Sequence, residues 1–154
     1  MKKSILFLTA LAGCIAACQN KSPEQKIDSM TNQPDTNITA SKACYSYING
    51  KDTVSLSYTT AGNAVAGKLN FNYFGKDRNT GTINGMIKGD TILADYTFNS
   101  EGKSSIRQVA FLKKDDKLLE GYGDTEEKDG KIAFKNVAGL KYIDALSLKA
   151  IPCK

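Results

Sequence analysis

Residues 65–73, which read VAGKLNFNY, decide the fold because apolar and polar residues alternate along them. Every second side chain of an extended strand points to the same face of a sheet, so this stretch has one face for a core and one for water. Residues 53–58 (TVSLSY) and 91–98 (TILADYTF) repeat the pattern. A period of two in three separate stretches predicts antiparallel strands.

Turn-forming sequences separate these stretches at short intervals, as in a chain of β-hairpins. The predicted turns are at Asn49-Gly50, Gly62-Asn63, residues 75–81, Gly89-Asp90, Glu101-Gly102, residues 114–117 and residues 124–130. The last of these has acidic residues and a glycine but lacks the spacing of a calcium loop, so we expect a solvated hairpin. The spacing predicts eight or nine short strands, with room for a single helical turn over residues 137–145.

Many short antiparallel strands leave exposed edges unless the sheet closes on itself or stacks on another. We therefore predict an all-β domain that forms an eight-stranded up-and-down barrel, lipocalin-like in its broad form, with a β-sandwich as the alternative. Three glycines within predicted strands, Gly67, Gly85 and Gly121, are expected to mark bulges or sharp bends. An eight-stranded barrel is just wide enough for side chains to fill it. The large side chains expected inside are Leu69, Phe71, Tyr96, Phe98 and Phe111.

The first residues have the composition of a bacterial export signal. Met1-Lys2-Lys3 is basic, and the apolar stretch over residues 4–17 is shorter than the about 20 residues that a membrane-spanning helix needs. Small residues lead into Cys14 and again into Cys18, and both sites resemble the lipobox in which a cysteine is acylated. Cleavage before Cys18 leaves polar residues next to the lipid. We predict a signal peptide over residues 1–17 and lipidation of Cys18, with Cys14 as the alternative.

Residues 18–43 are expected to form a lipidated cysteine and a flexible linker. Their polar composition cannot bury enough surface to offset the entropy cost of ordering. Residue 19, which follows the predicted lipid site, is not the aspartate of an inner-membrane retention signal. The sequence therefore favours an outer-membrane anchor, in either leaflet, for a domain over residues 44–154. An exported protein without a lipid is the less favoured interpretation.

Two cysteines remain, Cys44 and Cys153, near the two ends of this domain. An exported protein meets an oxidising environment, so an even pair predicts a disulfide, with two free thiols as the alternative. The bond requires the first and last strands to lie side by side.

The composition excludes several classes of function. The chain has no histidine, which removes the commonest general base, the commonest zinc ligand and the usual serine triads. The formal net charge is +5, and two of the lysines lie in the signal peptide. A small charge without clustered arginine does not favour nucleic acid. We expect no catalytic residues, no cofactor and no metal.

Arg107 is the most informative polar residue. It shares strand parity with Val109 and Phe111, so its side chain is expected to point into the barrel. A buried guanidinium needs an acceptor, which Glu120 or Glu101 can supply. We favour a structural ion pair that plugs the barrel end, and the alternative is a contact with a ligand carboxylate. A pair of carboxylates for glycan cleavage, drawn from Asp95, Glu101 and Glu120, has little support.

Residues 95–98 (DYTF), residues 100–102 (SEG), Arg107 and residues 120–123 (EGYG) form a series. This series resembles small uncharacterised lipoproteins of Bacteroidota that have a lipocalin-like barrel domain. The resemblance extends from Cys44 to Cys153. It implies a lipoprotein and implies no activity.

These observations predict a monomeric, membrane-anchored envelope lipoprotein with a non-catalytic structural or binding domain. One alternative is a carrier that holds a small apolar ligand inside the barrel. Another is a module that binds an envelope protein and resembles the membrane-bound lysozyme inhibitors. A glycan-acting enzyme is least favoured. The state of the interior separates the first two, because a filled barrel leaves no room for cargo.

Overall fold

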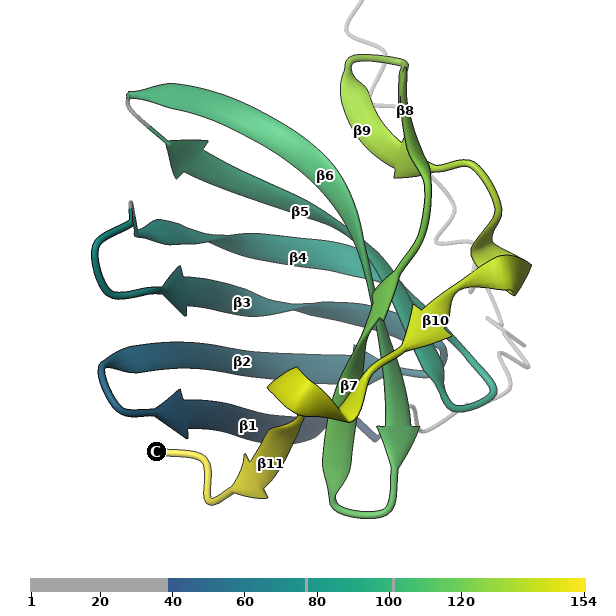
Figure 1. The fold of residues 1–154 in the computed structure, drawn as a ribbon. Coiled ribbons are helices and arrows are strands. Elements are labelled where there is room, and N and C mark those ends of the chain that lie inside the picture. Colours follow the sequence, from purple (N-terminus) through teal and green to yellow (C-terminus); the bar gives the residue numbers. More distant parts are fainter. Residues whose placement is uncertain (1–38, 77, 101) are drawn as a thin grey trace, which may run out of the picture. The chain divides into compact units, whose positions relative to one another are not determined.

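The computed structural model describes residues 39–76, 78–100 and 102–154, and these form an all-β fold (Figure 1). The predicted signal peptide, both lipobox cysteines, the linker up to residue 38 and Glu101 lie outside the described residues. The strands are β1 (Ser41–Asn49), β2 (Asp52–Ala61), β3 (Ala64–Asn72), β4 (Asn79–Lys88), β5 (Thr91–Ser100), β6 (Lys103–Lys114), β7 (Lys117–Tyr122), β8 (Thr125–Lys128), β9 (Lys131–Phe134), β10 (Lys141–Tyr142) and β11 (Leu148–Ile151). Two 3-10 turns, η1 (Val137–Gly139) and η2 (Asp144–Leu146), lie where a single helical turn was expected.

Eight of the strands close into an antiparallel barrel. Strands β1 to β7 pair in sequence order, and β11 pairs with both β7 and β1. The predicted eight-stranded barrel is confirmed, and the sandwich alternative does not form. Figure 1 shows β6 curving strongly toward β7, where the sheet turns to close.

The last strand of the ring is broken into two pieces, which the sequence did not predict. After β7 the chain forms the β8–β9 hairpin, and β9 lies parallel to β6 with Ile132 opposite Arg107. Both β10 and β11 then pair with β7, with Tyr142 opposite Gly121 and Leu148 opposite Leu118. The η2 turn lies between these two pieces, so it interrupts the eighth strand beside the middle of β7.

The predicted turns are close to the observed ones. Gly62-Asn63 and Gly89-Asp90 are two-residue hairpin loops, because their flanking residues pair. The loop after β1 is shifted by one residue to Gly50-Lys51. The loop between β3 and β4 is shorter than predicted, because β4 already begins at Asn79. Strand β1 begins at Ser41, three residues before the expected boundary at residue 44, because Ser41–Ala43 pair with β2.

Side chains fill the barrel, and they include the large residues expected inside it. Leu69, Tyr96 and Phe111 are fully buried, and Phe71 is 3% exposed. Phe98 is partly buried and packs against this core. Burial of large apolar side chains is the main driving force for such a fold, at about 25 cal/mol per Å² removed from water.

The glycines predicted at bulges serve another purpose in two cases. The strand register continues without interruption through Gly67 and Gly85, so neither marks a bulge. A Cβ atom on Gly67 would collide with the backbone of Ser57 and Tyr58, and one on Gly85 would collide with the backbone of Leu93 and Ala94. Glycine is needed there because neighbouring strands of the curved sheet approach closely.

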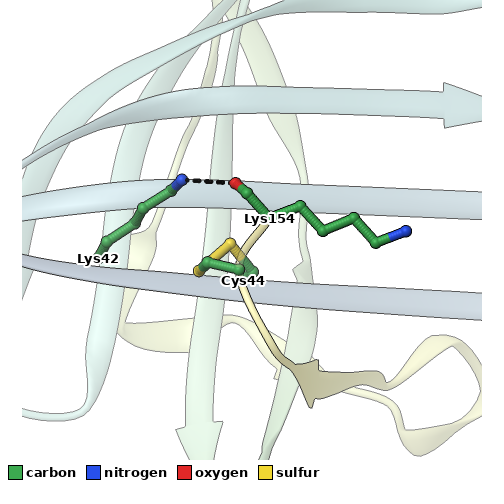
Figure 2. The surroundings of a disulfide bond; sticks show 4 residues. Lys42, Cys44 and Lys154 are labelled. Carbon is green, nitrogen blue, oxygen red and sulfur yellow. Dashed lines mark hydrogen bonds between the residues drawn. A yellow bond between two sulfur atoms is a disulfide. The ribbon is translucent and has the colours of Figure 1, made fainter.

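The two ends of the barrel differ. The disulfide end has the three hairpin loops that follow β2, β4 and β6, together with the bond between Cys44 and Cys153. The Cα atoms of these cysteines are 5.3 Å apart, so the predicted disulfide is present. Figure 2 shows the bond and the adjacent hydrogen bond from Lys42 Nζ to the Lys154 carbonyl oxygen, 3.1 Å long. The mouth end has the β1–β2 loop, the β3–β4 loop and the end of β7.

Candidate functional site at the barrel mouth

A pocket of about 500 Å³ lies at the mouth end, and we call it the mouth pocket. Its polar lining comes from six side chains on five separate parts of the chain: Asp52, Lys76, Asn79, Arg107, Glu120 and Tyr122. Phe71, Tyr73 and Leu146 supply its apolar walls. The interrupted last strand contributes here, because Leu146 belongs to η2.

Arg107 points inward, as its strand parity indicated. Its Cζ atom lies 5.1 Å from the ring centroid of Phe71, 5.5 Å from that of Tyr96 and 5.4 Å from that of Phe98. Tyr96 and Phe98 stack with their centroids 4.8 Å apart. A guanidinium within about 6 Å of an aromatic face is attracted to it, so three rings hold this cation in place.

The aromatic rings leave the hydrogen-bonding capacity of Arg107 unused. Its Nε atom is buried and has no hydrogen-bond partner. Within the described ranges, the salt bridges are those of Lys117 with Asp144 and Lys131 with Asp95, and neither involves Arg107. A buried donor without an acceptor reduces stability. Among the described residues, the Arg107 guanidinium at the mouth pocket has no salt-bridge partner.

The predicted ion pair between Arg107 and Glu120 does not form. Glu120 lies opposite Phe111 on β6, four residues along the strand from Arg107, which is about 13 Å at 3.3 Å per residue. Both side chains still line the mouth pocket. Glu101, the other predicted partner, lies outside the described residues.

Glu120 pairs instead with a tyrosine that sequence reasoning missed. The hydroxyl of Tyr122 donates to Glu120 Oε2 over 3.0 Å. Burial raises the pKa of the Glu120 carboxyl, and the Tyr122 hydrogen bond and the Arg107 charge partly oppose that rise. Burial and the nearby Glu120 charge likewise raise the pKa of Tyr122.

Two further charges of the site come from the start of β2 and from the β3–β4 loop. Asp52 Oδ1 accepts a hydrogen bond of 2.7 Å from the Phe74 backbone N–H, which ties the β3–β4 loop to the start of β2. Lys76 Nζ lies 5.9 Å from the ring centroid of Tyr73. In the sequence these residues resemble ordinary solvated turn positions, and no local signal marks them as neighbours.

Asp95 and Glu120, the two described carboxylates considered for glycan cleavage, do not form a pair. Asp95 bonds Lys131 Nζ at 2.6 Å, on the outer side of the barrel wall. Glu120 has the strand parity of the inward-facing Leu118 and Phe111, so the two carboxylates lie on opposite faces of the sheet.

The described ranges contain no group of three or more histidine, cysteine or acidic side chains placed to hold a metal ion. In the same part of the chain, no helix has the length and apolarity to cross a membrane. The arrangement at the mouth can bind: it offers a fixed cation, hydrogen-bond acceptors and aromatic walls. No protein-family model, curated protein or solved structure matches this chain.

Proposed function

We propose that this protein is a lipid-anchored component of the bacterial cell envelope whose barrel is a non-catalytic binding domain. The observation that carries the binding role is Arg107, a cation without a salt-bridge partner among the described residues, which lines an open pocket of about 500 Å³. Pockets of this size, with a few polar groups on apolar walls, are typical of small-molecule sites.

The mouth supports this role better than the interior does. Leu69, Tyr96 and Phe111 are fully buried within the barrel. This filling speaks against a carrier that encloses an apolar ligand. A ligand is therefore expected to enter the mouth pocket and stay near its rim.

The anchor is supported by the sequence. The basic start, the short apolar stretch and the small residues before Cys18 match a lipoprotein signal, and Cys14 is the alternative site. Two or three acyl chains on one cysteine hold a protein firmly at a membrane, at about 0.8 kcal/mol per buried CH₂. The outer membrane is the favoured location.

A protein partner is the second candidate, favoured by the rim of the mouth. Ile48 and Phe74 lie in or beside the loops of the mouth end and are 72% and 69% exposed. Lys51 Nζ lies 4.1 Å from the ring centroid of Phe74. Large exposed apolar side chains beside a pocket are a feature of protein-binding surfaces.

The anchor is tested by mass spectrometry and fractionation of cells that express the full chain. Cys18→Ala should abolish the acylated N-terminus and move the protein to the aqueous fraction, whereas Cys14→Ala should leave both unchanged. The opposite pattern would assign the lipid to Cys14. Wild-type protein without an acyl group would contradict the anchor.

The binding role is tested on full-length protein extracted from envelopes in detergent, with native mass spectrometry as the readout. A small molecule should accompany the wild type and be lost in Arg107→Gln. Arg78→Gln is the matched control, because Arg78 is exposed and hydrogen-bonds Asn72 instead of lining the pocket. Retention of the bound molecule in Arg107→Gln would contradict binding at the mouth.

A further inference from the structure

The mouth pocket contains a specific mismatch between donors and acceptors. Arg107 presents a planar set of N–H donors, yet no described residue forms a salt bridge or side-chain hydrogen bond with it. Of the two carboxylates of the pocket, Asp52 accepts from the Phe74 N–H with one oxygen, and Glu120 accepts from the Tyr122 hydroxyl with one oxygen. A ligand can therefore supply an acceptor that the described residues do not place at Arg107.

The geometry of guanidinium favours one kind of acceptor. Its parallel N–H groups match the two oxygens of a planar oxyanion, which can accept both bonds at once. The three rings around the Arg107 guanidinium restrain its orientation, so little side-chain freedom remains to be lost on binding.

The charges of the pocket limit the charge of that ligand. Lys76 and Arg107 are positive, and Asp52 and Glu120 are acidic. A phosphate with two negative charges would meet two acidic neighbours, whereas one negative charge needs only the unpaired cation. Burial raises the pKa of Glu120, which lowers the repulsion that a single negative charge would meet.

The walls limit the body of the ligand. Phe71, Tyr73 and Leu146 provide apolar surface next to the charges. Below them the barrel is filled, since Leu69 and Phe111 are fully buried. A long acyl chain would have no space, but a ring or a short branched group fits a pocket of about 500 Å³.

We propose that the mouth pocket binds a small monocarboxylate with a compact apolar or aromatic body, held by Arg107 through its two carboxylate oxygens. This proposal rests on the proposed binding role of the mouth and specifies the class of ligand.

Phenylacetate is the probe, and phenylacetamide, phenyl phosphate and palmitate are the comparisons. Binding to full-length protein in detergent is measured by calorimetry, and the site is mapped by chemical-shift changes of the tyrosines. Phenylacetate should bind at millimolar concentration or below. The amide, the phosphate and the long-chain acid should each bind at least about tenfold more weakly, which corresponds to one decade in Kd.

Three variants separate recognition from folding. Arg107→Gln should weaken phenylacetate binding by at least about tenfold, while Arg78→Gln should leave it unchanged. Arg107→Lys keeps the charge but loses the planar donor pair, so it should also weaken binding. Glu120→Gln removes an acidic neighbour and should strengthen phenylacetate binding several-fold, an effect that a folding defect cannot produce.

Each outcome decides between the proposals. Equal binding of the acid and the amide at the mouth would overturn the carboxylate proposal and leave the mouth as a binding site. Preference for phenyl phosphate would identify a different anion class and overturn it as well. If none of the probes binds the mouth, the carboxylate proposal fails. If in addition no small molecule accompanies the native protein, the proposed binding role fails too.

Discussion

Both ends of the barrel contain stacked aromatic residues, but the groups that lie beside these rings differ. At the disulfide end, Tyr45 and Tyr58 stack with their centroids 6.0 Å apart beside a covalent link between the first and last strands. In the mouth half, the stack of Tyr96 and Phe98 adjoins a charged guanidinium. Both ends therefore stack aromatic rings, but one stack lies near a disulfide and the other lies against a cation.

Buried polar atoms without partners show the same asymmetry. In the described part of the chain they are Asn79 Oδ1, Tyr96 OH and Arg107 Nε, and all three belong to the mouth half. Such groups reduce stability and are tolerated where a site has to meet a ligand. The disulfide end therefore contributes to the stability of the fold, and the unpaired polar atoms of the mouth half reduce it.

Removing the disulfide should have the largest effect. The bond closes a loop of 109 residues, so Cys44→Ala with Cys153→Ala should lower the free energy of unfolding by up to about 4–5 kcal/mol. Urea unfolding of the full chain measures this change. Ligand binding at the mouth should persist in the remaining folded protein. A loss below about 1 kcal/mol would contradict the assigned role of the disulfide end.

A methyl group at Gly81 should have the next largest effect. A Cβ atom there would lie 2.8 Å from Phe98 Cα and 2.8 Å from Tyr96 Cε2, and backbone cannot move aside cheaply. Gly81→Ala should lower the free energy of unfolding by about 1–3 kcal/mol. The exposed neighbour provides a control, since Thr82→Ala should change it by less than about 1 kcal/mol. Equal effects would show that the close approach is not limiting.

Two tyrosine hydroxyls should respond in opposite directions. Tyr96 OH is buried without a partner, so Tyr96→Phe should raise the free energy of unfolding by about 1 kcal/mol. Tyr122 OH donates to Glu120, so Tyr122→Phe should lower it by a similar amount, about 1 kcal/mol. Paired urea titrations compare the two. A loss of stability in Tyr96→Phe would mean that its hydroxyl has a partner after all.

The smallest expected effect is a dependence on pH. Burial raises the pKa of Glu120 above its ordinary 4.5, so the folded chain binds this proton more tightly than the unfolded chain. The resulting stability is fully present below the ordinary pKa and is lost as the pH rises through the raised pKa. Glu120→Gln should remove this part of the pH dependence. An unchanged profile of unfolding free energy against pH would contradict the assignment.

Much of the barrel could be predicted because β2, β3 and β5 each carry their own pattern. Residues 65–73 alternate, and the structure buries Val65, Leu69 and Phe71 within them. The glycine loops after β2 and β4 are at their predicted positions, since the hairpin turn is a local property of two residues. The cysteine pair was predicted from the even number of cysteines that remain after the expected signal peptide and lipid site.

The mouth could be predicted only in part. Strand parity places Arg107 inside, but its distance from Glu120 depends on how β6 and β7 are aligned, and alternation does not specify that register. Asp52 lies beside the β3–β4 loop, which contains Lys76, because β2 pairs with β3. Both residues share a pocket with Arg107 and Glu120 because the sheet closes into a barrel. The short pieces β10 and β11 have too few residues to show a period of two.

The disulfide also determines how the domain responds to a mechanical load. A pull along the incoming chain reaches β1 at Ser41 and arrives at Cys44 three residues later. Beyond that point β1 cannot be peeled from its neighbours by itself, because Cys153 and the end of β11 must follow it. A force applied to the chain before Ser41 would therefore act on β1 and on the end of β11 together, through a covalent bond, instead of separating the hydrogen bonds of β1 alone.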